Sequence, residues 1–161
     1  KLILNHDPFT KGDYFIDYLD EYKNGTLVLN IKESGIEDTV LKEVRSRGIK
    51  SYFLLDVEFP YLYSATKKGE RNIAVRFSEK EPIENIKLFD GVVDWIWIDT
   101  ITKLPLSEGI IPSLKNFKSC LVCPSRWGRV NEIEKIKLKL NRYKINCVMT
   151  ELDLIRNWIN Y

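Results

Sequence analysis

Short apolar runs alternate along the chain with stretches in which apolar residues fall at helical spacing. The runs are rich in β-branched and aromatic residues, and they predict strands at residues 2–4, 26–33, 51–56, 73–76, 92–99, 119–123 and 145–149. The stretches between them predict helices at residues 12–23, 34–47, 81–89, 130–143 and 152–158, a helix or tight loop at 60–66, and a loop with a helical turn at 102–114. Such alternation of strands and helices is typical of a parallel sheet.

Polar residues end nearly every predicted strand, namely His6, Lys32, Asp56, Arg76, Asp99, Ser125 and Glu151. A (β/α) barrel gathers the carboxyl ends of its strands around one mouth, where barrel enzymes have their active sites. An open doubly wound sheet uses one switch point instead, and this sequence has no glycine-rich phosphate loop. The pattern therefore favours an α/β fold of the TIM-type barrel class, as one domain over residues 1–161, with an open α/β binding domain as the alternative. A complete barrel has eight strands, so we expect the first one or two units to be missing.

Composition and charge narrow the class of protein further. The 161 residues are 44% hydrophobic and 30% charged, which is ordinary for one globular domain. The formal net charge of +2 is too small to indicate binding to nucleic acid or to a membrane surface. No apolar run approaches the roughly 20 residues of a transmembrane helix. We therefore expect no nucleic acid and no transmembrane segment.

Three cysteines, Cys120, Cys123 and Cys147, lie in apolar surroundings. The C-x-x-C spacing of the first two falls on a predicted strand, where residues three apart point to opposite faces. Neither a histidine nor a second C-x-x-C accompanies them, so a zinc site is not predicted. Reduced, buried cysteines and the lack of a visible signal peptide predict a cytoplasmic protein.

Three of the strand ends resemble motifs of the glycerophosphodiester phosphodiesterases. Residues 5–8 (NHDP) resemble the His-Asp that follows an early strand in that family. Residues 29–32 (LNIK) resemble its Glu-x-Lys strand, and residues 147–151 (CVMTE) resemble its final strand, which ends in Thr-Asp. The order and spacing agree, so the resemblance runs over most of the chain. The broader match is to the barrel superfamily that also holds phosphatidylinositol-specific phospholipase C.

The resemblance implies a distorted (β/α)8 barrel that hydrolyses phosphodiesters with two histidines and a divalent cation, Mg²⁺ or Ca²⁺. His6 would be the general acid that protonates the leaving alkoxide, and Lys32 would offset the charge of the phosphate. Asn30 stands where the family has a metal-ligand carboxylate, and Asp7 is a further candidate ligand; an amide oxygen can bind either cation but supplies no negative charge. The family's other histidine and its Glu-x-Asp metal pair would precede residue 1, and His6 is the one histidine of this sequence.

Asp56, Arg76 and Trp97 are candidate substrate-binding residues by their positions. Asp56 closes an apolar strand and would face the mouth of the barrel. Arg76 lies between apolar strand residues, where a charge needs a partner or a wet cavity, so it would either pair with Asp56 or Asp99 or bind phosphate bidentately. Trp97 shares a strand face with Trp95, which suits core packing or, alternatively, a wall on which a sugar or glycerol stacks.

Two hypotheses of function follow. The first is a phosphodiesterase of the glycerophosphodiester type. The second is a degenerate barrel that binds a phosphorylated or sugar ligand without hydrolysing it, which the neutral Asn30 and the single histidine favour. Arg126 and Arg129, on either side of Trp127 and Gly128, form an anion-binding rim or a solvated loop. A truncated barrel would carry exposed strand edges, which a homo-oligomer would bury.

Overall fold

The computed structural model describes residues 1–7 and 9–159, so Pro8 of the NHDP motif lies outside the described residues. The chain divides into two compact units, unit 1 (Lys1–Gly69) and unit 2 (Glu70–Tyr161). Both units combine helices with strands, and their parallel strands form separate sheets of two and four strands. The prediction of one barrel domain over the whole chain therefore stays a prediction.

Unit 1 contains an antiparallel and a parallel pair of strands, with three helices. Its elements are, in order, β1 (Ile3–Leu4), β2 (Asp13–Tyr14), α1 (Phe15–Glu21), β3 (Leu27–Asn30), α2 (Glu37–Ser46), β4 (Tyr52–Leu55) and α3 (Phe59–Lys67). The first predicted strand is present, but the expectation that it belongs to the parallel sheet is wrong, because it pairs antiparallel with β2. The loop between β1 and β2 turns the chain back on itself, and the side chain of Asn5 holds that turn with hydrogen bonds.

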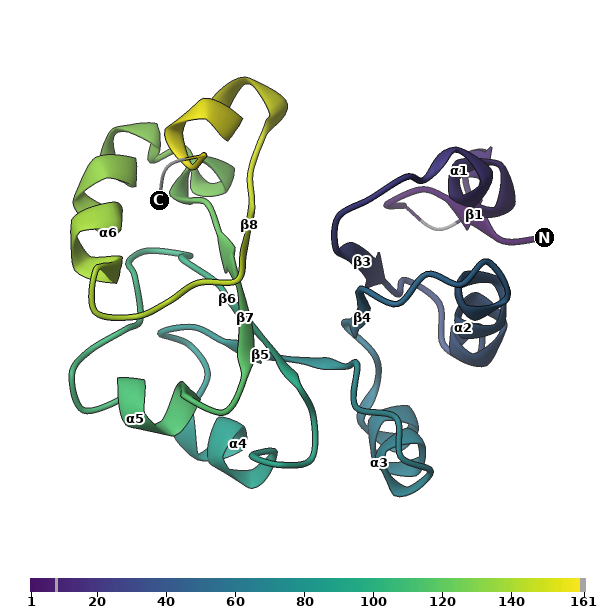
Figure 1. Cartoon of the computed structure of the whole chain (residues 1–161), viewed down its shortest axis with the longest axis horizontal. Helices are drawn as coiled ribbons and strands as arrows, with labels where there is room; N and C mark the ends of the chain where they lie inside the picture. Colours follow the sequence, from purple (N-terminus) through teal and green to yellow (C-terminus); the bar gives the residue numbers. More distant parts are fainter. Residues whose placement is uncertain (8, 160–161) are drawn as a thin grey trace. The chain divides into compact units, whose positions relative to one another are not determined.

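Strands β3 and β4 and helices α1, α2 and α3 all contribute buried residues to unit 1. Leu27 pairs with Tyr52 and Asn30 with Leu55 in a parallel register. Helices α2 and α3 lie on the same side of the two strands (Figure 1). The apolar residues of α2 recur at helical spacing and are buried, as expected for a helix that covers a sheet; they are Val40, Leu41 and Val44. Glu37 is also buried at the start of α2, and its carboxylate accepts a hydrogen bond from the Gly35 N–H at 2.7 Å.

Unit 2 is built around four parallel strands in the order β5-β6-β7-β8. Its elements are β5 (Ala74–Phe77), α4 (Ile83–Leu88), β6 (Trp95–Ile98), α5 (Ile111–Leu114), β7 (Lys118–Val122), the 3-10 helices η1 (Pro124–Trp127) and η2 (Val130–Glu132), α6 (Ile133–Leu140), β8 (Cys147–Met149) and the 3-10 helix η3 (Leu152–Asn157). Strands β3 to β8 confirm the six predicted after the first, and α4 and α6 lie within predicted helices. The predicted closing helix is a 3-10 helix instead, with i to i+3 bonds such as Leu154 N–H to Glu151 O at 3.0 Å.

The two faces of the four-stranded sheet differ in chemistry. One face carries Ile96, Ile98 and Leu121, which are fully buried. The register places Arg76 beside Trp97, and Trp97 beside Cys120, on the other face. Figure 1 shows α5 and α6 on the same side of the four strands.

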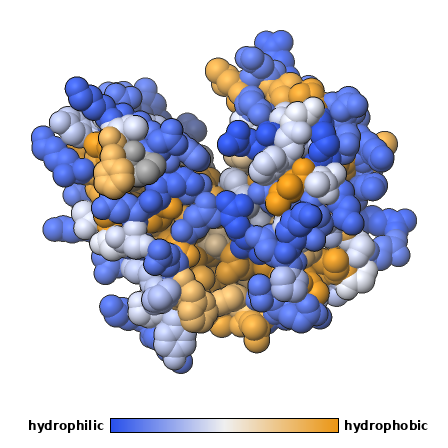
Figure 2. Space-filling view, turned by 180° about the vertical axis from the view of Figure 1, so that it is seen from behind, coloured by the Kyte–Doolittle hydropathy of each residue, from blue (hydrophilic) through white to orange (hydrophobic). Residues whose placement is uncertain are grey.

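The face of the molecule shown in Figure 2 has no single dominant hydrophobic area. Hydrophilic side chains cover most of that face, and hydrophobic side chains show between them in smaller patches. Large exposed hydrophobic residues are spread over both units, for example Phe59 in unit 1 and Leu138 in unit 2. Scattered residues of this kind are normal for a protein surface.

Candidate functional site

The loop between β1 and β2 presents His6 and Asp7 together. His6 Nδ1 lies 3.0 Å from Asp7 Oδ1, and both side chains are 75% exposed. The loop is held by its own polar groups, since Asn5 donates to Lys11 O at 2.7 Å and accepts from the Asp7 N–H at 2.9 Å, while Thr10 donates to Asp7 O at 2.8 Å. A carboxylate on one ring nitrogen orients an imidazole and leaves the other nitrogen to exchange a proton with a ligand.

The carboxyl ends of β3 and β4 bring three of the predicted residues to one edge. Lys32 Nζ lies 3.7 Å from Asp56 Oδ2, and Asn30 is the exposed last residue of β3. Asp56 has a φ of 61°, in the left-handed region, which aspartate tolerates better than most residues. Backbone conformations of this kind cluster at binding and active sites. The edge therefore offers an amide, an ammonium and a carboxylate within unit 1.

The carboxyl end of the unit 2 sheet is organised around the buried carboxylate of Asp99. Asp99 is 4% exposed, and its Oδ2 accepts from Arg76 NH1 at 3.2 Å. Its Oδ1 accepts from Trp127 Nε1 at 2.8 Å, so each oxygen has a donor. Of the two alternatives for Arg76, pairing with Asp99 is thus confirmed, and 39% of the Arg76 side chain stays exposed. Bidentate binding of phosphate by this arginine stays a prediction.

The loops around Asp99 are held by further hydrogen bonds. Arg129 donates to the Thr100 carbonyl and forms an ion pair with Glu132, with 2.6 Å between NH1 and Oε2. Arg129 therefore serves to hold the loop after β7, while Arg126 is exposed. The Ser125 hydroxyl donates to Glu151, and this bond lowers the pKa of the Glu151 carboxyl.

Glu79, just beyond β5, links the ends of β5 and β6. Its Oε1 accepts from both the backbone N–H and the hydroxyl of Thr102, each at 2.6 Å. Burial by itself would raise the pKa of Glu79, but the hydrogen bonds from Thr102 favour the charged form and bring the pKa below its ordinary 4.5. The folded chain therefore stabilises the charged form of Glu79 more than the unfolded chain does.

This lowered pKa predicts a pH-dependent contribution to stability. The contribution is complete above the unfolded pKa of about 4.5 and is lost as the pH falls through the lower folded value. Thr102→Val should lower the free energy of unfolding at neutral pH by about 1 kcal/mol or less, and the difference from the wild type should shrink between about pH 5 and pH 3. Urea unfolding across this range measures it, with Thr102→Ser, which keeps the hydroxyl, as the control. A difference that stays constant with pH would contradict the link to Glu79.

The structure places the predicted site residues in three groups. His6 and Asp7 share a loop, Asn30, Lys32 and Asp56 share a strand edge, and Arg76 joins Asp99. Within the described part of unit 1, no hydrogen bond or ion pair joins His6 to Lys32. Trp97 is 6% exposed, which fits core packing, and the stacking wall stays a prediction.

Trp127 is the residue of the site that sequence reasoning missed. The neighbouring residues Arg126 and Arg129 suggested an anion-binding rim. The structure shows instead that the Trp127 indole N–H donates to the buried Asp99, while the Trp127 side chain is exposed. The signal was available in principle, because an aromatic residue at the end of a parallel strand lies at the edge where ligands bind. Its partner could not be predicted, since Asp99 follows a different strand.

The described part of the chain does not supply a full set of ligands for the divalent cation that the resemblance implies. Across residues 1–7 and 9–159, no group of three or more His, Cys, Asp or Glu side chains could hold a metal ion. Asn30 and Asp56 supply oxygens at one edge, but Asp56 is paired with Lys32, and Asp7 lies beside His6. The residues present therefore do not fit the cation by themselves, and its role stays a prediction from the resemblance.

Comparisons with protein-family models, with curated proteins and with solved structures found no match. The resemblance to glycerophosphodiester phosphodiesterases accordingly depends on the three strand-end motifs. In the described part of the chain, no helix has the length and apolar character needed to cross a membrane. What the fold and the sites define is a mixed α/β protein with charged residues at the carboxyl ends of its parallel strands.

Proposed function

We propose that the protein recognises a small phosphodiester at the carboxyl ends of its parallel strands and hydrolyses it, as a phosphoric diester hydrolase similar to the glycerophosphodiester phosphodiesterases. One observation, repeated in both units, carries the proposal. A cation at the end of one strand is paired with the aspartate that follows the next strand: Lys32 with Asp56 at 3.7 Å, and Arg76 with Asp99 at 3.2 Å.

Cations held in this way suit a phosphate group. The aspartate limits the motion of each long side chain, so less conformational entropy is lost when an anion binds. Lys32 is 37% exposed and Arg76 is 39% exposed, so both can be reached from solvent. An ammonium binds phosphate as a point charge, whereas a guanidinium can offer two parallel N–H groups.

The apolar part of a glycerol or sugar ligand also has a candidate partner. Trp127 is 43% exposed, and the bond from its Nε1 to Asp99 fixes the orientation of the ring. An oriented aromatic ring offers a flat apolar surface at a low cost in side-chain entropy. Within unit 2, the combination of Arg76 and Trp127 around Asp99 favours a ligand with both a charged and an apolar part.

Hydrolysis of a phosphodiester breaks one P–O ester bond, and the leaving alkoxide needs a proton. In its protonated form His6 can give that proton, with Asp7 orienting the ring from Nδ1. Non-hydrolytic binding of a phosphorylated or sugar ligand is the second candidate. The observation that favours it is the neutral amide of Asn30 at the edge beside Lys32 and Asp56.

A pair of assays distinguishes these two candidates. Turnover of glycerophosphocholine and of bis-p-nitrophenyl phosphate is measured with Mg²⁺, with Ca²⁺ and with EDTA, and binding of glycerophosphocholine is measured by calorimetry. We expect turnover, and comparison of the rates with Mg²⁺, Ca²⁺ and EDTA shows whether it depends on a cation. Binding without turnover would identify the non-hydrolysing form, and neither binding nor turnover would refute the proposal.

Lys32 provides a test of the binding step alone. Lys32→Met keeps most of the apolar stem and removes the charge, and it should weaken glycerophosphocholine binding about tenfold, or roughly 1.4 kcal/mol. Lys42→Met is the matched control, because Lys42 is an exposed lysine on helix α2. Equal affinity of the two variants would exclude Lys32 from the ligand site.

A further inference from the structure

Two cysteines of unit 2 face each other across neighbouring strands. Cys120 of β7 and Cys147 of β8 are register partners in a parallel pair, so their side chains point to the same face of the sheet. Neighbouring strands lie about 4.8 Å apart, which falls within the Cα separation that disulfides span. The Cys147 thiol also donates to the backbone carbonyl of Ser119, the residue before Cys120, at 3.8 Å, which places its sulfur beside β7.

The third cysteine lies outside this pair. Cys123 is fully buried, three residues beyond Cys120, and its backbone N–H donates to Met149 O at 2.9 Å.

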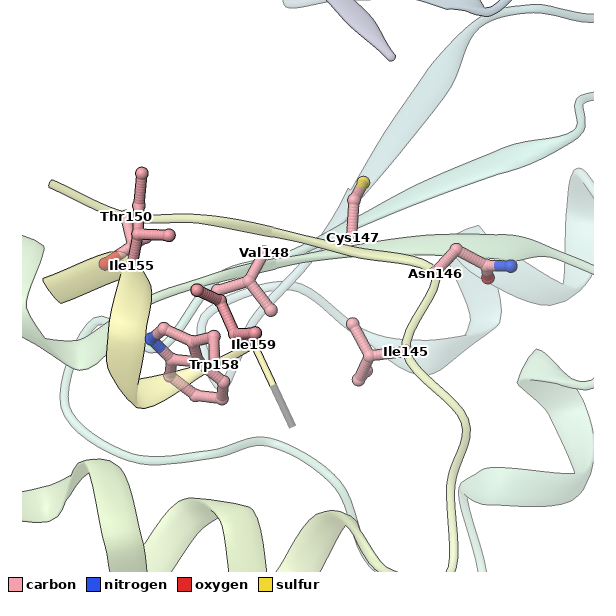
Figure 3. A pocket seen from close by; sticks show the side chains of 8 residues that line it. All are labelled: Ile145, Asn146, Cys147, Val148, Thr150, Ile155, Trp158 and Ile159. Carbon is pink, nitrogen blue, oxygen red and sulfur yellow. The ribbon is translucent and has the colours of Figure 1, made fainter. Parts of the chain in front are cut away.

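Figure 3 shows the sulfur of Cys147 on the opposite side of β8 from the side chain of Val148. Cys147, Val148 and Trp158 are all among the residues that line a pocket of about 270 Å³. The register with β7 places the sulfur of Cys147 on the face of the sheet that carries Cys120, opposite the side chains of Val148 and Trp158.

The two thiols differ in acidity and in access. The hydrogen bond from Cys120 lowers the pKa of Cys147, although burial opposes this effect. The same bond, together with burial, raises the pKa of Cys120 well above its ordinary value. Cys147 is partly exposed, whereas Cys120 is buried. Because the thiolate is the reactive form of cysteine, Cys147 should react first and Cys120 second.

We infer that Cys147 and Cys120 form a dithiol that is oxidised by hydroperoxides, with Cys147 as the attacking thiol and Cys120 as the resolving thiol. In the first step the Cys147 thiolate attacks a peroxide oxygen; an S–O bond forms, the O–O bond breaks, and the departing hydroxide or alkoxide takes up a proton. In the second step the Cys120 sulfur attacks the sulfenic sulfur of Cys147. The S–S bond forms, the S–O bond breaks, and the hydroxide leaves with the Cys120 proton as water.

The electrons balance across the two steps. The two thiols lose two electrons and two protons, and hydrogen peroxide is reduced to two molecules of water. The product ties β8, which lies at one end of the strand order, covalently to its neighbour β7. None of these residues belongs to the pairs that carry the proposed phosphodiester site, so the inference stands independently of that function.

The wild-type protein provides the first experiment. The folded chain is treated with hydrogen peroxide, the remaining thiols are blocked with iodoacetamide, and the digest is read by mass spectrometry. We expect a disulfide between the peptides that contain Cys120 and Cys147. Because Cys120 and Cys123 share one tryptic peptide, Cys123→Ser serves as the matched control and should keep the link. No disulfide, or a link that disappears in Cys123→Ser, would overturn the inference.

The order of reaction provides the second experiment. In folded wild-type protein Cys147 should be alkylated faster than Cys120 and Cys123, and this difference should vanish in urea. In Cys120→Ala, peroxide should leave a sulfenic acid on Cys147 that dimedone traps, and alkylation of Cys147 should slow several-fold. If that variant fails to fold, the alkylation rates in the wild-type protein still test the inference. Slower alkylation of Cys147 than of Cys120 would contradict the assigned roles.

Discussion

Replacing His6 with alanine should slow hydrolysis of glycerophosphocholine by about 10²–10⁴-fold, the range that a positioned general acid contributes. The imidazole lies 3.0 Å from Asp7 and gives a proton to the leaving alkoxide in the proposed reaction. Its side chain is 75% exposed, so its removal should leave the free energy of unfolding nearly unchanged. Steady-state kinetics of the purified variant, with circular dichroism as a check on folding, measures the effect.

The partner of His6 separates a catalytic from a binding role. Asp7→Asn keeps a hydrogen-bonding group beside the ring but removes its charge, so kcat should fall by less than in His6→Ala while KM stays similar. An unchanged kcat in His6→Ala would exclude His6 as the proton donor. A raised KM with an unchanged kcat would instead assign it to ligand binding.

Replacing Asp99 with alanine should lower the free energy of unfolding by about 2–3 kcal/mol. The carboxylate is buried and accepts from both Arg76 and Trp127, and hydrogen bonds to charged groups are worth about 1.5–3 kcal/mol each. Their full sum is not expected, because the guanidinium of Arg76 is 39% exposed and can be rehydrated when its partner is removed. Urea unfolding followed by tryptophan fluorescence gives the difference.

Two variants make the Asp99 measurement specific. Asp94→Ala removes an aspartate from another ion pair of unit 2, with Arg71 at 2.8 Å, where both side chains are more exposed, and should cost at most about 1 kcal/mol. Asp99→Asn retains an oxygen for the Trp127 N–H and should be intermediate. Equal losses in Asp94→Ala and Asp99→Ala would show that burial of the carboxylate adds nothing.

Local patterns predicted most of the strands and the parallel direction of β3 to β8, but not their division into separate sheets. The sequences of β4 and β6 are rich in apolar, β-prone residues, so their composition alone predicts a strand. Both strands are buried on both faces in the structure. The pairing of β1 with β2 gave no such sign, because Asp13 and Tyr14 form a strand of two exposed residues. The division into units and the separation of the sheets depend on contacts between distant segments, which hydrophobic periodicity does not encode.

The candidate site was predictable to a similar degree. Parallel strands end at one edge, which is why Lys32 and Asp56 could be expected together and are found paired. The sequence left open whether Arg76 pairs with Asp56, pairs with Asp99 or binds phosphate. The register decides for Asp99, because it places Arg76 opposite Trp97, two residues before Asp99. The contact of Trp127 with Asp99 needs the conformation of a loop, and no spacing rule provides that.

The left-handed backbone at Asp56 restricts how this edge can change during evolution. A glycine would keep the turn and lose the partner of Lys32, and an asparagine would keep the turn and lose the charge. A β-branched residue would oppose the turn itself. The turn and the pairing with Lys32 thus depend on one residue: glycine and asparagine preserve only the turn, and a β-branched residue preserves neither.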